Sequence, residues 1–294
     1  QQISDELVGK QILERKGKCE ANDAVIEVLK VGDKLAFEER YEHSYPHCWR
    51  SKTPVIFRAM DQWFVNIDHD GFRDKALAAI DGVNWVPGWG RNRIEGAVQS
   101  RPDWCISRQR SWGVPIPAFY DAQGEPILDA RIVRNTADLV QEHGSNVWFE
   151  RELADLWDAV KPADWDGAEA IGKSTDTLDV WIDSGSSSRA VLMQRDELGR
   201  PGAEAGTHGA WQADYYLEGS DQHRGWFQSS LLLSLAGNGV APYRNVLTHG
   251  FMVDADREKI SKSKQAGGYS KPQTAEAYIG NYGADIVRLW VTSQ

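Results

Sequence analysis

The pattern of residues 214–253 constrains the fold more than any other part of the chain. Residues 214–219 and 245–253 are short apolar stretches of the kind that form strands. Between them, large apolar side chains recur at helical spacing: Trp226, Phe227, Leu231 and Leu235. A strand, a helix and a strand in this order form a right-handed unit with parallel strands. The chain is therefore predicted to be an α/β protein.

The ends of these elements can also be predicted. Ser220 or Asp221 is expected to cap the helix at its start, and Gly237 is expected to end it. Residues 178–183 are a further strand candidate, because apolar and polar residues alternate weakly there. A hairpin turn is expected at residues 121–124, before a helix that includes residues 137–143.

Composition narrows the class of protein. The 294 residues are 41% hydrophobic and 26% charged, which is typical of a folded protein with a sizeable core. The net charge of −10 argues against a basic nucleic-acid-binding module, although a local basic strip remains possible. The three cysteines form no CxxC pair, so we expect a reducing compartment. No apolar run is long enough to span a membrane, and no membrane partner is expected.

Polar clusters follow the three strand candidates, at residues 183–185, 218–222 and 248–250. Ligands of parallel α/β sheets bind outside the carboxyl ends of the strands. The carboxylates of Glu218 and Asp221 could accept hydrogen bonds there from a ribose or an ammonium group. Asp221 could equally serve only as a helix cap, and both readings stay open.

Two tryptophans and one lysine-rich run are further candidates. Trp181 and Trp226 could wall an apolar side-chain pocket, or they could simply pack in the core. Residues 259–264 contain three lysines and two serines, and glycines follow. Such a run could neutralise a polyphosphate during nucleotidyl transfer, although it is also typical of a solvated loop. It does not match the P-loop pattern.

Five segments together resemble a known family. They are residues 45–54, 104–113, 178–185, 216–227 and 259–263. In this order they are similar to segments of the class I aminoacyl-tRNA synthetases, most closely the isoleucine-specific group. Residues 259–263, KISKS, resemble the family's KMSKS loop, with Ile260 in the position of Met.

The resemblance implies a fold and a domain organisation. The chain would be the C-terminal half of a class I synthetase Rossmann-like nucleotide-binding domain with a small inserted connective subdomain. Residues 1–50 would be the tail of the editing insertion and the return segment, and residues 51–112 a catalytic-domain segment. Residues 113–174 would be the connective insertion, and residues 175–294 the second half of the catalytic domain.

The resemblance also implies a role for each matching residue. Lys259 and Lys262 would be catalytic, and Lys262 would contact the ATP phosphates with Ser261 and Ser263. The remaining residues would bind the aminoacyl-adenylate: Glu218, Gly219, Asp221, Gln222, Trp226, Trp181 and His249. Of these, Trp181 and Trp226 would wall the pocket for a branched aliphatic side chain.

The implied reaction is ATP-dependent activation of L-isoleucine, followed by transfer to tRNA(Ile) in protein biosynthesis. ATP would bring Mg²⁺ with it, and no protein-bound zinc is expected, since Ser51 stands where a cysteine pair would need Cys. We expect a cytoplasmic enzyme that is a monomer when complete. A valyl- or leucyl-tRNA synthetase is an alternative.

A second alternative is a catalytically inactive fragment or binding module. The family's HIGH motif is absent from these residues, and the sequence starts with Gln1 rather than Met. We therefore expect an internal fragment of a longer enzyme that is inactive alone.

Overall fold

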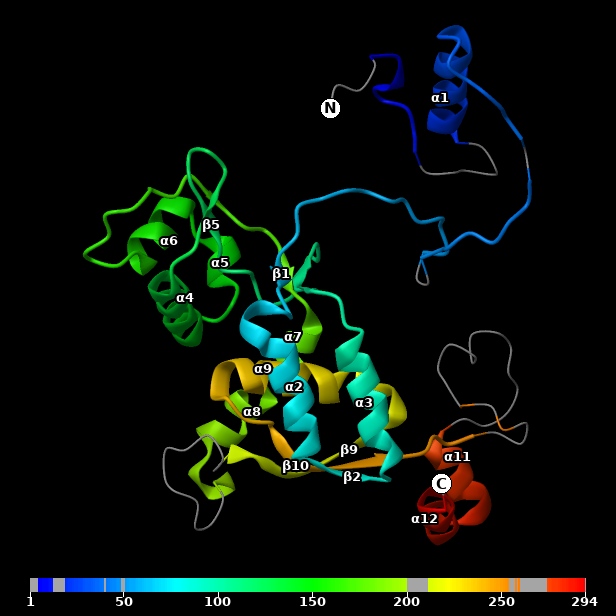
Figure 1. Ribbon diagram of the computed structural model, residues 1–294, viewed down its shortest axis with the longest axis vertical. Helices are drawn as coiled ribbons and strands as arrows, with labels where there is room; N and C mark the ends of the chain where they lie inside the picture. The colour runs from blue at the N-terminus through cyan, green and yellow to red at the C-terminus, as the bar shows by residue number, and fades with distance from the viewer. Residues whose placement is uncertain are drawn as a thin grey trace. The chain divides into compact units, whose positions relative to one another are not determined.

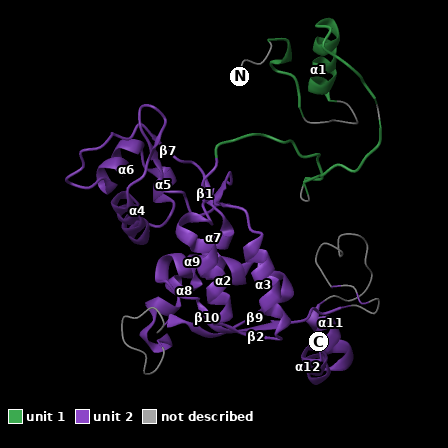
Figure 2. Ribbon diagram, in the orientation of Figure 1, with its two compact units in different colours: residues 1–61 green, residues 62–294 purple. Residues whose placement is uncertain are grey.

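The computed structural model describes residues 5–12, 19–39, 41–48, 51–199, 211–253, 257, 259 and 274–293. The chain divides into two units, residues 1–61 and residues 62–294 (Figure 2). The first unit contains the short helix η1 (Asp5–Leu7) and the helix α1 (Glu20–Val31). Acidic residues in the first turn of α1 and Lys30 in its last turn suit the helix dipole. None of the described residues in this unit is buried.

A three-stranded parallel sheet organises the second unit. Its strands are β2 (Asn84–Val86), β10 (Tyr243–His249) and β9 (Ala213–Gly219), in that spatial order. Both pairs of neighbours are parallel. The helix α9 (Trp226–Asn238) connects β9 to β10, so the predicted strand–helix–strand unit and the α/β class are confirmed.

Three helices cover one face of this sheet (Figure 1). They are α2 (Phe72–Asp81), α3 (Trp89–Gln99) and α9. The core lies between the helices and the sheet and includes the following buried residues: Ile80, Ile94, Leu231, Tyr216 and Val246. The alternate residues of β9 face the other way, and Tyr215 and Leu217 are exposed there.

A second hydrophobic cluster lies within residues 119–170. It consists of Phe119, Ile132, Trp148, Leu156, Trp157 and Val160. The cluster is built from α4 (Ala130–His143), α5 (Val147–Glu150), α6 (Leu153–Val160) and the strands β5 (Phe119–Tyr120), β6 (Pro126–Ile127) and β7 (Gly172–Lys173). The predicted hairpin is present, since β5 and β6 are antiparallel and Gly124 N–H donates to the carbonyl of Asp121.

The strand predicted at residues 178–183 is wrong. The strand β8 (Thr177–Leu178) is short, and the helix α7 (Val180–Gly185) follows it. Asp179 is the reason, because its side chain accepts a hydrogen bond from Trp181 N–H and caps the helix. The weak alternation of apolar residues in this segment reflects a one-and-a-half-turn helix rather than a strand.

The predicted ends of α9 are also wrong. A short helix, η6 (Ser220–Arg224), lies between β9 and α9, so neither Ser220 nor Asp221 caps α9. The side chain of Gln222 accepts from Trp226 N–H instead. The helix ends one residue after Gly237, and Gly239 is the left-handed residue that stops it.

The other described elements are short or peripheral. They are η2 (His69–Gly71), β1 (Phe64–Val65), β3 (Trp104–Cys105), β4 (Ser107–Arg108), α8 (Ser187–Ala190), η3 (Leu192–Gln194), η4 (Asp196–Leu198), α11 (Ala275–Tyr282) and α12 (Ala284–Thr292). No helix in the described part of the chain has the length and apolar character needed to cross a membrane.

Candidate functional site

The carboxyl ends of β9 and β10 bring three of the predicted site residues side by side. In the register of the two strands, Glu218 lies opposite Thr248, and Gly219 lies opposite His249. Glu218 and His249 are exposed, whereas Thr248 and Gly219 are buried. The edge of the sheet therefore exposes the carboxylate of Glu218 and the imidazole of His249 on consecutive register positions, with the two side chains on opposite faces of the sheet.

Glu218 lies on the helix-covered face of the sheet. Strand side chains alternate between faces, so Glu218 shares a face with the buried Tyr216. It is nevertheless exposed, because it stands at the end of the strand. A ligand at this edge can therefore reach its carboxylate.

Gly219 lets two side chains approach the backbone of β9. A Cβ atom on Gly219 would lie 2.6 Å from Cε1 of Phe251 and 2.9 Å from Oδ1 of Asp221. Real Cβ contacts are never this short, so any other residue would displace Phe251 or Asp221. The strand expected at residues 245–253 would include Phe251. The observed strand β10 ends at His249, so Phe251 lies after it.

Lys259 reaches the same cluster through Phe251. Its Nζ atom lies 3.5 Å from the centroid of the Phe251 ring, within the range of a cation–π contact. An antiparallel β-bridge joins Val253 and Lys259. The other predicted residues of the lysine-rich run, Ser261, Lys262 and Ser263, lie outside the described residues.

The two tryptophans have different surroundings. The Trp226 ring stacks on Tyr216 at 3.9 Å with an angle of 10°, and its Nε1–H donates to the carbonyl of Ser184 at 2.8 Å. Trp226 thus joins β9 to α7 and packs against the core. Trp181 is 38% exposed and its ring lies against Gly225. The packing of Trp226 fits the interpretation as a core residue, and the exposure of Trp181 fits the interpretation as a pocket wall.

A cavity of about 250 Å³ adjoins Trp181. Arg101, Arg108 and Arg224 are among its lining residues, together with the buried Gln228. Arg101 donates to the side chain of Gln228, and burial lowers the pKa of Arg101. The arginines of this cavity can donate hydrogen bonds, and the indoles of Trp104 and Trp181 supply apolar surface. The cavity would therefore suit a ligand with both polar and apolar parts.

His223 is a buried residue that the sequence did not single out. It is the buried residue of η6, and its ring lies 6.0 Å from that of Trp85 and 5.8 Å from that of Trp89. Its Nδ1–H donates to the carbonyl of Ser220 at 2.9 Å. Burial is the main reason why its pKa lies below the usual value of 6.5. The imidazole is therefore neutral near pH 7. Its hydrogen bond to Ser220 stabilises η6, which also contains Asp221 and Gln222.

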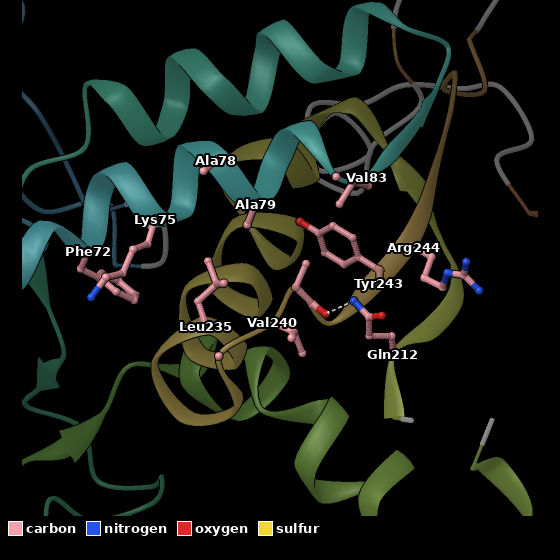
Figure 3. A pocket seen from close by; sticks show the side chains of 13 residues that line it. Phe72, Lys75, Ala78, Ala79, Val83, Gln212, Leu235, Val240, Tyr243 and Arg244 are labelled. Carbon is pink, nitrogen blue, oxygen red and sulfur yellow. Dashed lines mark hydrogen bonds between the residues drawn. The ribbon is translucent and has the colours of Figure 1, made fainter. Parts of the chain in front are cut away.

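A second cavity, of about 510 Å³, lies at the opposite end of the sheet (Figure 3). Gln212 and Tyr243, at the amino ends of β9 and β10, border it together with Ala78 and Ala79 of α2. Gln212 is tied to the carbonyl of Ala241 at 2.9 Å. This cavity contains none of the predicted site residues, and it does not contribute to the carboxyl-end cluster.

No group of three or more His, Cys, Asp or Glu side chains that could hold a metal ion occurs among the described residues. The three cysteines Cys19, Cys48 and Cys105 are not paired as disulfides.

Sequence reasoning missed Phe251, His223 and Gly225. Phe251 was counted as a strand residue, and His223 lies in the segment 216–227 without a separate role. No local signal marks Gly225, because the requirement for glycine arises from Trp181, which is 44 residues earlier in the chain.

The chain is similar to known proteins over nearly its whole length. Residues 8–294 match the family model described as tRNA synthetases class I (I, L, M and V). The chain is 51% identical over 276 residues to the isoleucine–tRNA ligase of Geobacter sulfurreducens, which covers 94% of this chain and 28% of that protein. It is 53% identical over 275 residues to the isoleucine–tRNA ligase of Nitrosococcus oceani, covering 93% of this chain and 27% of that protein.

A solved structure is also similar. It is Mycobacterium tuberculosis methionyl-tRNA synthetase bound by methionyl-adenylate, with a TM-score of 0.46 and 18% sequence identity. The match covers 82% of this chain and 35% of that chain. The chain spans little more than a quarter of the length of the two isoleucine–tRNA ligases described above.

Proposed function

This chain belongs to the class I tRNA synthetases of the isoleucine, leucine, methionine and valine group, and we propose that it forms the adenylate-binding part of an isoleucine–tRNA ligase. The two relatives described above carry that name at 51% and 53% identity. The observation that carries the proposal is the cluster of Glu218, Gly219 and His249 at the carboxyl ends of two parallel strands.

The proposed reaction begins with activation of L-isoleucine. A carboxylate oxygen of the amino acid attacks the α-phosphate of ATP, the bond to the β-phosphate breaks, and pyrophosphate leaves. No general base is required, because the amino-acid carboxylate is already ionised near neutral pH. Catalysis then depends on positioning and on charge neutralisation. In the second step a hydroxyl of tRNA(Ile) attacks the carbonyl carbon of the isoleucyl-adenylate, an ester bond forms, and AMP leaves.

The residues take the following roles in this proposal. Glu218 accepts hydrogen bonds from the adenylate, and Gly219, Asp221, Gln222 and His249 line its ribose and amino-acid portions. Trp181 and Trp226 wall the side-chain pocket. Lys259 and Lys262 neutralise the phosphate charge, with Ser261 and Ser263 beside Lys262. The contact of Lys259 with Phe251 supports the role of Lys259, since Phe251 also lies against Gly219 at the adenylate site.

Mg²⁺ accompanies ATP as part of the substrate in this proposal, since Mg²⁺ is commonly bound through substrate phosphates. The proposed enzyme acts in the cytoplasm and as a monomer.

The test replaces the matching segment of the Geobacter sulfurreducens ligase with this chain and measures isoleucine-dependent exchange of pyrophosphate into ATP. The chimaeric ligase is expected to exchange with isoleucine in preference to valine or leucine, and to charge tRNA(Ile). A folded chimaera with no exchange would support the alternative of an inactive module. A preference for valine or leucine would contradict the substrate.

Glu218→Gln tests the site itself. Loss of a charged acceptor is expected to lower the isoleucine-dependent exchange rate about 10-fold or more, because hydrogen bonds to charged groups are worth about 1.5–3 kcal/mol. Glu142→Gln is the matched control, since Glu142 is exposed near the end of α4, and it is expected to leave the rate unchanged. Equal rates for both variants would exclude the role of Glu218.

A further inference from the structure

Gly225 occupies the buried junction between η6 and α9. A Cβ atom at this position would lie 2.9 Å from Cη2 and 3.2 Å from Cζ3 of Trp181. It would also lie 2.6 Å from Oε1 of Gln222. The six-membered ring of Trp181 therefore takes the space that any other residue would need for its first side-chain atom.

The backbone of Trp181 cannot easily move away from Gly225, because the start of α7 is anchored by hydrogen bonds. Its backbone N–H donates to Oδ1 of Asp179 at 3.3 Å. Asp179 is only 5% exposed, and its Oδ2 accepts from Arg108 at 2.9 Å and from Trp104 Nε1–H at 3.0 Å. A substituent on Gly225 would thus push the indole ring sideways rather than move the helix that carries it.

The neighbouring indole is held just as firmly. Trp226 N–H donates to Oε1 of Gln222 at 2.9 Å, and the Trp226 ring is fixed by Tyr216 and by the carbonyl of Ser184. The Gln222 amide is the end of a flexible side chain and could shift by rotation. Rotation of Gln222 relieves its own contact, whereas the contact with the rigid Trp181 ring is relieved only when the whole indole is displaced.

We propose that Gly225 is a specificity-determining residue of the amino-acid pocket, because its lack of a side chain sets the position of Trp181 relative to Trp226. The proposal rests on the function proposed above, in which these two indoles wall the isoleucine side chain. Gly225 acts through Trp181 and is a positioning residue. A pocket wall matched to one extra methylene separates isoleucine from valine by roughly 10–200-fold.

The test introduces Gly225→Ala into the chimaeric ligase and measures exchange with isoleucine and with valine. The kcat/KM for isoleucine is expected to fall about 10-fold, since the displaced ring no longer fits the longer side chain. Valine, being smaller, is expected to lose less, so the isoleucine-to-valine ratio falls. The KM for ATP is expected to stay unchanged.

A matched glycine and a second-site variant complete the test. Gly96→Ala is the control, because Gly96 is an exposed residue of α3 with no neighbouring atom within 4 Å of the added Cβ; the ratio should not change. In the Gly225→Ala background, Trp181→Phe removes the ring atoms that collide and should raise the isoleucine-to-valine ratio again.

The outcomes separate the two proposals. A parent chimaera that fails to exchange with isoleucine would contradict the proposed function. A parent that exchanges normally, while Gly225→Ala keeps its isoleucine-to-valine ratio, would overturn the role of Gly225 alone. So would a loss of thermal stability in Gly225→Ala that lowers both rates equally and that Trp181→Phe does not reverse.

Discussion

At the scale of single residues, buried polar groups near the candidate site couple its stability to pH. His223 is completely buried, and its Nε2 atom has no hydrogen-bond partner among the described residues. Burial is the largest cause of its lowered pKa, and Arg93 acts in the same direction. The hydrogen bond to Ser220 and the charge of Asp221 act in the opposite direction but are weaker.

The lowered pKa predicts a loss of stability in acid. Above about pH 6.5 the imidazole is neutral in both the folded and the unfolded chain, and it adds no pH dependence. As the pH falls below 6.5, the unfolded chain binds the proton first, so the free energy of unfolding decreases until the pH reaches the lower pKa of the folded state. Urea unfolding at pH 8 and pH 5 measures this decrease.

Substitution identifies the group responsible. His223→Gln should remove this part of the pH dependence, although the variant will be less stable at pH 8 because the packing between two indoles is lost. His69→Gln, at an exposed position, should keep the pH dependence of the original chain. An identical pH profile for His223→Gln and the original chain would rule out His223 as its source.

At the scale of elements, the end of α9 decides where β10 begins. Gly239 has a φ of +75°, a left-handed conformation that L-residues adopt at a cost of about 1–2 kcal/mol. The conformation ends the helix and lets the chain turn toward Tyr243, the first residue of β10. Helix α9 has buried residues on all sides, polar ones such as Gln228 and Ser230 among them, because it packs in the core and also against α7.

Gly239→Ala is predicted to lower the free energy of unfolding by about 1 kcal/mol. No atom lies within 4 Å of the added Cβ, so the loss would come from backbone conformation alone. Gly82→Ala is the control, since Gly82 ends α2 with a φ of −78° and tolerates a side chain. If chemical denaturation shows the same effect for both variants, the left-handed conformation is not the cause.

At the scale of the whole molecule, the described part of residues 62–294 contains two separate hydrophobic clusters. One lies between the parallel sheet and its three helices, and the other is organised around Phe119, Trp148 and Trp157. The Phe119 ring lies 5.0 Å from that of Trp148 and 5.1 Å from that of Trp157, in edge contacts. Aromatic side chains supply the large contact area that a cluster of this size needs.

Because the two hydrophobic clusters are separate, we expect a substitution in one of them to increase local unfolding only in the elements packed around it. Phe119→Ala should cost about 3–5 kcal/mol locally and should accelerate amide hydrogen exchange in α4, α5 and α6 while leaving α9 and β10 protected. Leu231→Ala should do the reverse. Exchange followed by mass spectrometry distinguishes the regions, and uniform acceleration in either variant would mean that the clusters unfold as one.

Much of the fold was predictable because its signals are local. The strand–helix–strand order of β9, α9 and β10 follows from apolar spacing, and the hairpin before β6 follows from its turn residues. Predictions failed where a side chain changed the local structure. Asp179 turned an expected strand into α7, and Gln222 replaced Asp221 and Ser220 at the start of α9.

The residue types of the candidate site, its position after the strands and its family resemblance were all available from the amino-acid sequence, since they depend on order and spacing. Which residues meet was decided only by the tertiary structure. The pairing of β9 with β10 brings Gly219 beside His249, Phe251 connects Gly219 to Lys259, and Gly225 must be glycine because the ring of Trp181 fills the space beside it. These contacts join segments up to 44 residues apart, and no local pattern encodes them because each depends on how separate elements pack.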